Sequence, residues 1–414
     1  MARESYLTAV DLGSATIRVV VAKYDPTGDQ LLVVGVGEAA MEGMQKGVIT
    51  DVEEAVAGLT RALDAAERVS GVPIERAYVS INGAHISSQN SRGVIAVSRA
   101  DGEITGDDVA RVINAAQAVS LPNNREILHV LPQDFVVDGQ ERIHDPVGMT
   151  GVRLEVDAHI VEGSAPFIKN VAKVVNQAGV HVEDFVFSPL AAAAATLTKR
   201  QRELGVLLLD LGAGTASLVI YEENVLLSTA VLPVGASHIT NDVAIGMRTS
   251  IDVAEGLKTQ HGTALPDTVK ASERVVVETE DEGGEQENVS RQELSNIIRA
   301  RLDEIFSLVD GELKQVSRSG LLPAGVVLTG GGAQLAGVIE VAKKKLRLPA
   351  RIGRAENFGG IVDRIQGPQY AVVLGLLTWA FDQEQRGRSR VSLSLPDIRQ
   401  SVVKVKDWFR AFLP

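Results

Sequence analysis

Apolar residues recur along this chain in two patterns, which together predict a mixed α/β fold. Short apolar runs that end at glycine-rich turns, such as residues 206–209 and 326–328, are typical of strands buried on both faces of a sheet. Longer stretches, such as residues 48–69 and 290–318, carry apolar residues along one side of a helix instead. Sheets covered by helices are therefore the expected architecture.

Residues 206–221 are the most informative stretch, because they read as a strand, a tight turn and a second strand. Asp210 lies where the first apolar run ends. The turn that follows consists of Gly212, Ala213, Gly214 and Thr215. A turn of this kind points several backbone N–H groups into one concavity, which suits a phosphate. The carboxylate of Asp210 at its rim would suit Mg²⁺ or a water bound to Mg²⁺.

The same order of residues occurs near the N-terminus, in residues 7–21. Asp11 corresponds to Asp210, and Arg18 follows in the second strand. The turn between these strands consists of Gly13, Ser14, Ala15 and Thr16. An internal repeat predicts two similar half-molecules, each with one phosphate-binding hairpin in a shared cleft. A dinucleotide fingerprint is the weaker interpretation of these glycines, because it requires a helix directly after them and a strand pattern follows.

A third glycine-rich turn follows the apolar run at residues 326–328. It consists of Gly330, Gly331, Gly332 and Ala333. Consecutive glycines leave no side chains in the way, so a flat ring or a phosphate can lie against the backbone. Because two phosphate hairpins precede this turn, we expect it to complete the same site.

Two further pairs of residues are candidates for this nucleotide site. Gly235 and Ala236 follow a predicted strand at residues 230–234. Glu255 and Lys258 are spaced to lie on one face of a predicted helix. This second pair is either an ordinary ion pair within the helix or a source of polar contacts to the sugar and base of a nucleotide.

Composition excludes several functional classes. A chain of 414 residues suits two to four domains. Its net charge of −12 argues against broad nucleic-acid binding, so no nucleic-acid partner is expected. The absence of cysteine excludes disulfides, thiolate zinc sites and a cysteine nucleophile. The first strand begins close to the N-terminus and no apolar stretch reaches the length of a membrane span, so we expect neither a signal peptide nor a transmembrane helix.

Changes of pattern along the chain predict how it divides into domains. Between residues 84 and 163, strand-like pieces surround one helical piece, which indicates a small α+β insertion domain in the first lobe. The remaining predicted units are the first lobe at 1–83 with 164–200, the core of the second lobe at 201–240 with 311–385, a second-lobe subdomain at 241–310, a flexible linker at 386–400 and an amphipathic helix at 401–414.

The C-terminal stretch has the pattern of a membrane-binding helix. At about 100° per residue, its apolar side chains fall on one face and its basic side chains lie on the flanks. The apolar residues are Val402, Val405, Trp408, Phe409, Phe412 and Leu413, and the basic residues are Lys404, Lys406 and Arg410. Such a helix lies in the plane of an anionic membrane surface. The alternative is a helix that docks on the protein's own body.

The order of these elements resembles the actin-like ATPase superfamily. The matching elements are the hairpin at 11–16, a small-residue helix at 188–195, the hairpin at 210–215, the glycine turn at 329–333 and a second small-residue helix at 370–380. The position of the insertion, together with residues 234–242 and 255–262, is similar to the FtsA family of bacterial cell-division proteins. The resemblance implies an actin-like (ribonuclease H-like, duplicated) fold, with two lobes around a cleft for ATP and Mg²⁺.

The same resemblance implies roles and partners. Asp11 and Asp210 would act through Mg²⁺ and water, as metal-site and catalytic residues. The protein would polymerise on the cytoplasmic face of the inner membrane at the division septum, bind the C-terminal tail of FtsZ and contact later division proteins. We expect at most a slow ATPase, because no glutamate or glutamine can be assigned to orient the attacking water, and Ala15 and Arg18 also depart from the common actin-like pattern. The alternatives are a PilM-like pilus-assembly adaptor, which lacks such a tail, and a small-molecule kinase on the same scaffold.

Overall fold

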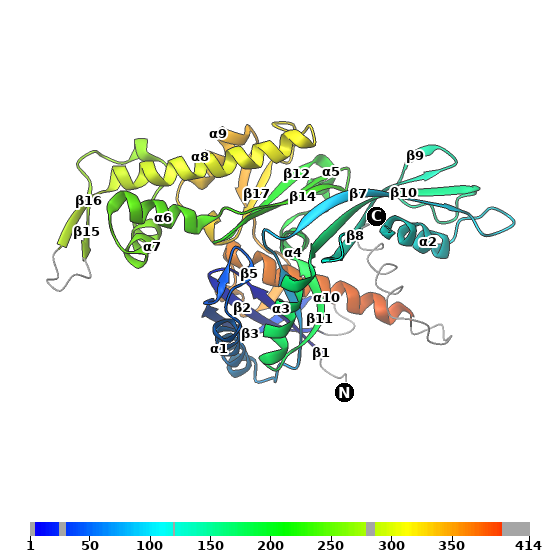
Figure 1. Ribbon diagram of the computed structural model, residues 1–414, viewed down its shortest axis with the longest axis horizontal. Helices are drawn as coiled ribbons and strands as arrows, with labels where there is room; N and C mark the ends of the chain where they lie inside the picture. The colour runs from blue at the N-terminus through cyan, green and yellow to red at the C-terminus, as the bar shows by residue number, and fades with distance from the viewer. Residues whose placement is uncertain (1–4, 25–29, 119–120, 279–285, 391–414) are drawn as a thin grey trace.

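The computed structural model describes residues 5–24, 30–118, 121–278 and 286–390. Two lobes, each built on a β-sheet with helices against it, form the main body, and a smaller domain projects from one side (Figure 1). Both main sheets share one topology: three consecutive strands pair antiparallel, and two later strands join in parallel beside the first. The duplicated α/β fold predicted from the repeated hairpins is therefore confirmed.

The first lobe contains a six-stranded sheet, and two helices pack against one of its faces to form a hydrophobic core. In order across the sheet, the strands are β11 (His181–Phe187), β6 (Arg76–Ile81), β1 (Ser5–Leu12), β2 (Thr16–Tyr24), β3 (Leu31–Ala40) and β19 (Phe358–Gly360). Helices α1 (Val52–Ser70) and α3 (Ala165–Gln177) cover this face. Val19 of β2 and Leu59 of α1 are fully buried in the core between them.

The second lobe contains a five-stranded sheet. In order, its strands are β14 (Val225–Leu232), β13 (Ala216–Glu222), β12 (Val206–Leu211), β17 (Val326–Thr329) and β18 (Ala350–Ile352). Helices α6 (Ala236–Met247), α7 (Ile251–Gln260), α8 (Arg291–Gln315) and α9 (Val338–Leu346) contribute side chains to one core with this sheet. Leu209 of β12 and Phe306 of α8 are fully buried in the core that these elements share. The predicted subdomain also contains a hairpin, β15 (Arg274–Glu278) and β16 (Gln286–Ser290), and lies at the left end of Figure 1.

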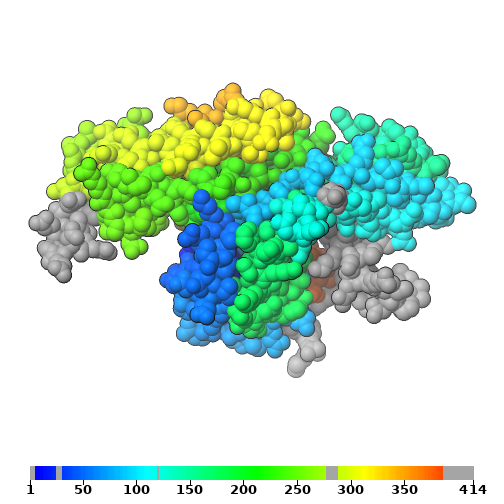
Figure 2. Space-filling model, viewed as in Figure 1, coloured from blue at the N-terminus to red at the C-terminus, as the bar shows by residue number. Residues whose placement is uncertain are grey.

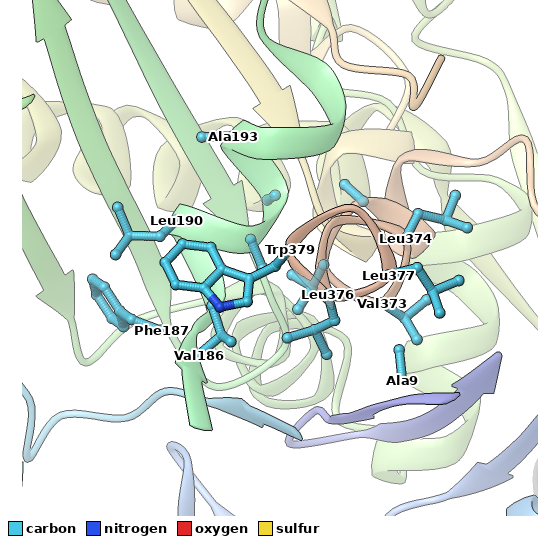
Figure 3. Packing of buried hydrophobic residues seen from close by; sticks show 14 of the residues in the cluster. Ala9, Val186, Phe187, Leu190, Ala193, Val373, Leu374, Leu376, Leu377 and Trp379 are labelled. Carbon is cyan, nitrogen blue, oxygen red and sulfur yellow. The ribbon is translucent and has the colours of Figure 1, made fainter. Parts of the chain in front are cut away.

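Two helices of small and apolar residues lie between the two sheets. α4 (Ser188–Thr196) and α10 (Ala371–Arg390) pack against strands of both lobes, so one core includes Val20 of β2 and Val219 of β13. Figure 3 shows the side chains of both helices meeting in this core. α4 and α10 therefore form the connection through which the lobes are held together.

The closest approach of these two helices depends on a glycine. A Cβ atom at Gly375 of α10 would overlap the carbonyl oxygen of Ala191 in α4. The two backbones thus touch without intervening side chains, and no larger residue fits at Gly375. The close packing predicted for the small residues of 188–195 is confirmed.

The insertion domain is a four-stranded antiparallel sheet with one helix. Its strands, in order, are β7 (Ser87–Ala96), β10 (Arg153–Ser164), β8 (Arg125–Val137) and β9 (Gln140–Ile143). α2 (Gly106–Gln117) covers one face, where Val112 and Phe135 are buried. The predicted α+β insertion is therefore confirmed.

The insertion domain also contacts the edge strand of the second lobe. Gln133 Nε2 donates to the carbonyl oxygen of Leu226 at 2.7 Å, and Ser88 Oγ donates to that of Thr229 at 3.0 Å. Figure 2 shows the two parts in contact along the upper edge of the molecule. Because the insertion begins and ends in the first lobe and also contacts the second, it connects the two lobes.

Local structure differs from the prediction at two places. The helix predicted from residue 48 begins at Val52, because a small hairpin, β4 (Met44–Gln45) and β5 (Val48–Ile49), precedes it. Its two turn residues, Lys46 and Gly47, have φ values of 50° and 77°, as a type I′ turn requires. Helix α5 (Lys199–Leu204) was not predicted. It buries no side chain, so its sequence has no apolar residues at helical spacing.

The domain boundaries near the C-terminus also differ from the prediction. The sequence assigns residues 311–385 to the second lobe, but β19 pairs with β3 and α10 packs against β1 of the first lobe. The chain therefore returns to the first lobe after β18. The predicted linker begins at residue 386, whereas α10 continues to Arg390. The rest of the linker and the amphipathic helix lie outside the described residues, within which no helix is both long and apolar enough to cross a membrane.

Candidate functional site

Both predicted hairpins line one cavity between the lobes, of about 120 Å³. The first contributes Gly13, Ser14, Ala15, Thr16 and Arg18, the second contributes Gly212, Ala213, Gly214 and Thr215, and the glycine turn contributes Gly330 and Gly331. Asp11 and Asp210 also line this cavity. Residues separated by most of the chain are therefore brought together as predicted. The cavity is smaller than the roughly 300–1,000 Å³ of typical ligand pockets, so a nucleotide would require the lobes to move apart.

Each hairpin presents unused backbone donors to this cavity. In the described part of the chain, the N–H groups of Ser14, Ala15, Ala213 and Gly214 have no hydrogen-bond acceptor. Ser14, Ala213 and Gly214 are buried or half-buried and Ala15 is exposed, and unused N–H donors at buried positions are uncommon in proteins. Four such donors around one cavity fit an anion with several oxygens, such as a polyphosphate.

The two aspartates occupy equivalent positions in the two sheets. Asp11 accepts a hydrogen bond of 2.7 Å from Ser80 Oγ on the adjacent parallel strand β6. Asp210 is 3.5 Å from Thr329 Oγ1 on the adjacent parallel strand β17. Both carboxyl groups are buried. The duplication thus extends from the strands to the hydroxyl groups that orient the acids.

Burial changes the acidity of both groups. Desolvation raises the pKa of Asp11, although the hydrogen bond from Ser80 and the charge of Arg18 oppose this. Desolvation and the negative charge of Asp11 raise the pKa of Asp210 to about 7. Two carboxylates that repel each other are stabilised by a divalent cation between them. No group of three or more acidic or histidine ligands for a metal occurs among the described residues, and Mg²⁺ commonly binds through one or two carboxylates and several waters.

Arg18 is already paired, which differs from the role predicted for it. Its Nε lies 2.7 Å from Glu38 Oε1, and the two residues are directly opposite each other on β2 and β3. The guanidinium also lies over the ring of Tyr370, 5.4 Å from its centre. Arg18 lines the cavity, but Glu38 neutralises its charge.

Gly235 and Ala236 do not line this cavity; they support the second hairpin from behind. Ala236 N donates to the carbonyl oxygen of Gly212 at 2.8 Å, and Ser237 N donates to that of Ala213 at 2.9 Å. The N-terminal donors of α6 are therefore used to hold the hairpin in place. This is a structural role where the sequence predicted a direct contact with the cofactor.

Glu255 and Lys258 also lie outside the cavity lining. Lys258 Nζ is 2.6 Å from Glu255 Oε2 and 2.8 Å from Thr240 Oγ1, so the pair joins α7 to α6. Gly332 packs against the side chain of Leu211. Ala333 lines a second cavity, of about 590 Å³, which continues along the start of α9.

Several residues that line the cavity were not predicted. They include Gly47 of the β4–β5 turn, Asn82, Ser188, Gln369 and Val372. Gln369 Oε1 is buried and has no hydrogen-bond partner in the described part of the chain. The position of Asn82 could have been predicted from the sequence, because it directly follows a parallel strand. Ligands bind at the carboxyl ends of parallel strands in α/β sheets.

A duplicated lobe with one glycine hairpin on each side of a cleft defines the actin-like ATPase fold. Two solved structures share it: the PilM–PilN type IV pilus biogenesis complex (TM-score 0.65, 15% identity, 89% of this chain and 97% of that one) and MreB 5 of Spiroplasma citri bound to AMPPNP (TM-score 0.54, 14% identity, 94% and 99%). At such identities the likeness shows the fold alone.

Sequence comparisons give the family. The model described as "Cell division protein FtsA" matches residues 207–375, and the model described as "SHS2 domain inserted in FTSA" matches residues 83–162. The cell division protein FtsA of Pseudomonas aeruginosa is 37% identical over 92% of this chain and 91% of that protein. The FtsA proteins of Bacillus subtilis (38%, 94% and 86%) and Escherichia coli K12 (32%, 98% and 97%) are similar over comparable lengths. The chain belongs to the FtsA family of cell division proteins.

Proposed function

We propose that this protein binds ATP with Mg²⁺ in the cleft, polymerises on the cytoplasmic face of the inner membrane at the division septum, and tethers FtsZ filaments there. The observation that supports nucleotide binding most directly is the pair of hairpins, whose unused N–H groups surround one cavity beside two buried carboxyl groups. Membership of the FtsA family supports the role in division.

Different residues of the cleft would bind different parts of the nucleotide. Backbone N–H groups of Ser14, Ala15, Ala213 and Gly214 would donate to phosphate oxygens. Asp11 and Asp210 would hold Mg²⁺ through its waters, and bound Mg²⁺ neutralises phosphate charge. The glycine turn 330–332 and the second cavity beside Ala333 leave room for the base end. Glu255 and Lys258 remain candidates for outer polar contacts through their position on α7.

Nucleotide binding is proposed as mainly structural, with at most slow hydrolysis. Arg18, the cation of the first hairpin, is paired with Glu38 and therefore stabilises developing phosphate charge weakly. Both lobes contribute donors, so a bound triphosphate holds the lobes in one relative position. A fixed relation between lobes is what repeated copies of one chain require to assemble into a filament.

Membrane attachment is assigned to the C-terminal residues 401–414 from their sequence. A short amphipathic helix binds a membrane weakly and reversibly on its own. Polymerisation would place many such helices on one surface, and their combined binding would exceed that of a single helix. Assembly and attachment are thereby linked, and the filament would present a surface to the FtsZ tail and to later division proteins.

Three measurements test these assignments. Mg²⁺ and ATP should raise the melting temperature of the wild-type protein, whereas Asp210→Ala should abolish this rise. The full chain should sediment with anionic liposomes, and Trp408→Glu should not; equal sedimentation would contradict the membrane assignment. A peptide carrying the FtsZ C-terminal tail should bind, while a scrambled peptide of the same composition should not.

A further inference from the structure

The two-residue turn of the β4–β5 hairpin lies against the tips of both phosphate hairpins. Gly47 N donates to Ser14 Oγ of the first hairpin at 3.1 Å. A Cβ atom at Gly214 of the second hairpin would lie 2.9 Å from the Cα atom of Lys46. Gly47 itself lines the cavity. The Lys46–Gly47 turn therefore borders the cavity where the two hairpins meet.

The backbone of this turn is held in place from a second side. Ala84 N donates to the carbonyl oxygen of Lys46 at 3.3 Å, and the Cα atom of Gly83 packs directly against Gly47. With contacts to Ser14 in front and to residues 83–84 behind, the position of the Lys46 backbone is fixed. A binding group on such a rigid turn is already oriented before its ligand arrives.

The side chain of Lys46 is exposed and its charge has no acidic partner. Within residues 5–24, 30–118, 121–278 and 286–390, no carboxylate forms an ion pair with Lys46. Burial lowers the pKa of His238 at the start of α6, and the positive charge of Lys46 lowers it further. Lys46 therefore lies near enough to the start of α6 in the second lobe for its charge to act on His238.

The cavity needs a positive charge that its lining does not supply. The charged residues in the lining are Asp11, Asp210 and Arg18. Because Glu38 neutralises Arg18, the lining presents two acids and no free cation to a polyphosphate. Mg²⁺ would offset the two acids, and the charge of the terminal phosphate would still lack a direct partner.

We propose that Lys46 is a phosphate-binding residue of this cleft and that its ammonium group binds the terminal phosphate of a bound nucleoside triphosphate. This inference rests on the proposed nucleotide-binding function. The Lys46–Gly47 turn touches the tips of the hairpins, whereas Gly330 packs against Asp210 and Leu211 at the strand ends. With the base end of the nucleotide beside residues 330–332, the end of the phosphate chain lies toward Lys46.

The test compares the affinities of ATP and ADP for the full-length protein. Titration calorimetry with Mg²⁺ would be performed on the wild type, Lys46→Met and Lys46→Arg. Methionine has a similar length without the charge, and neither substitution changes the backbone demand of the φ value of 50° at this position. The matched control is Lys343→Met, which removes an exposed lysine of α9 that lines neither cavity.

Lys46→Met should weaken ATP binding about tenfold or more and ADP binding by less than about threefold, because a hydrogen bond to a charged group is lost only with the triphosphate. Lys46→Arg should retain most of the affinity for ATP, and Lys343→Met should retain all of it. An equal change for ATP and ADP, or no change, would overturn the role of Lys46 while leaving nucleotide binding intact. Wild-type protein that binds neither nucleotide would instead overturn the proposed function.

Discussion

The side chain of Asn82 lies 2.8 Å from Ser217 Oγ, and this contact joins the first lobe to the second directly beside the phosphate hairpin. Asn82 follows strand β6 and is the last residue before the insertion domain. Ser217 is fully buried on β13. The Thr215 hydroxyl lies 3.5 Å from the same amide. The second hairpin is thus held by a residue from the opposite lobe.

Replacing Asn82 with alanine should loosen the second hairpin. A buried hydroxyl at Ser217 would lose its partner, which costs about 1–3 kcal/mol. We expect a lower free energy of unfolding by this amount and weaker ATP binding, measured by urea denaturation and calorimetry. Asn114→Ala, at an exposed position on α2, is the matched control. If Asn82→Ala and Ser217→Ala gave fully additive effects in the double variant, the contact would carry no energy.

Because α4 and α10 touch backbone to backbone, adding a single methyl group at their contact should strongly destabilise the fold. In Gly375→Ala the new Cβ would overlap the backbone of Ala191, so the helices must separate and the core between the lobes must shift. We expect a loss of about 3 kcal/mol or more in the free energy of unfolding, at the upper end for overpacking. Gly311→Ala on α8 meets no atom within 4 Å and should stabilise the helix by about 0.5–1 kcal/mol. Similar results for both variants would contradict the close approach.

The raised pKa of Asp210 predicts how stability without ligand depends on pH. Its pKa is about 7 in the folded protein and has its ordinary value of 3.8 in the unfolded chain, so the folded state binds more protons between these two pH values. The free energy of unfolding should therefore fall as pH rises from about 4 to about 7. Asp210→Asn should be more stable than the wild type near pH 8, by about 2–4 kcal/mol, with little difference near pH 4. Urea titrations without nucleotide or Mg²⁺ measure this, and an equal difference at both pH values would contradict it.

For His159 we expect the opposite pH dependence: the contact between the insertion domain and the second lobe should weaken as pH falls. Its Nε2 lies 3.0 Å from Thr229 Oγ1 and its Nδ1 lies 2.8 Å from Asn90 Oδ1. Burial lowers its pKa to about 4, below the usual 6.5, so the folded state binds fewer protons and stability is lost as pH falls through this window. Hydrogen exchange of β14 should accelerate between about pH 6 and pH 4 relative to the expected intrinsic change. His159→Gln should remove this excess, and its persistence in the variant would exclude His159 as the cause.

The parts of the site that could be predicted from sequence are those set by local order. Each hairpin is one continuous segment of the chain, an apolar strand followed by an aspartate and small residues. The repeat of this pattern predicts that both hairpins face one cleft. The sequence alone therefore predicts that side chains on these stretches, such as Asp11 and Asp210, line the cavity, and they do.

The parts that escaped prediction depend on partners distant in the sequence. The pairing of Arg18 with Glu38 follows from the register of β2 and β3, which the apolar pattern leaves open. The Lys46–Gly47 turn is flanked by strands of two residues, too short to show a period. The first part of helix α10, residues 371–381, is apolar around much of its surface, so its sequence indicates burial without indicating which lobe buries it.

The claim on which the rest depends is that both hairpins bind one triphosphate, and a crystal structure with AMPPNP and Mg²⁺ tests it most directly. The expected result is a single nucleotide whose phosphates accept hydrogen bonds from the turns after Asp11 and after Asp210, with Mg²⁺ on the side of the two carboxylates. A nucleotide bound to one hairpin alone, or at another place in the molecule, would contradict it.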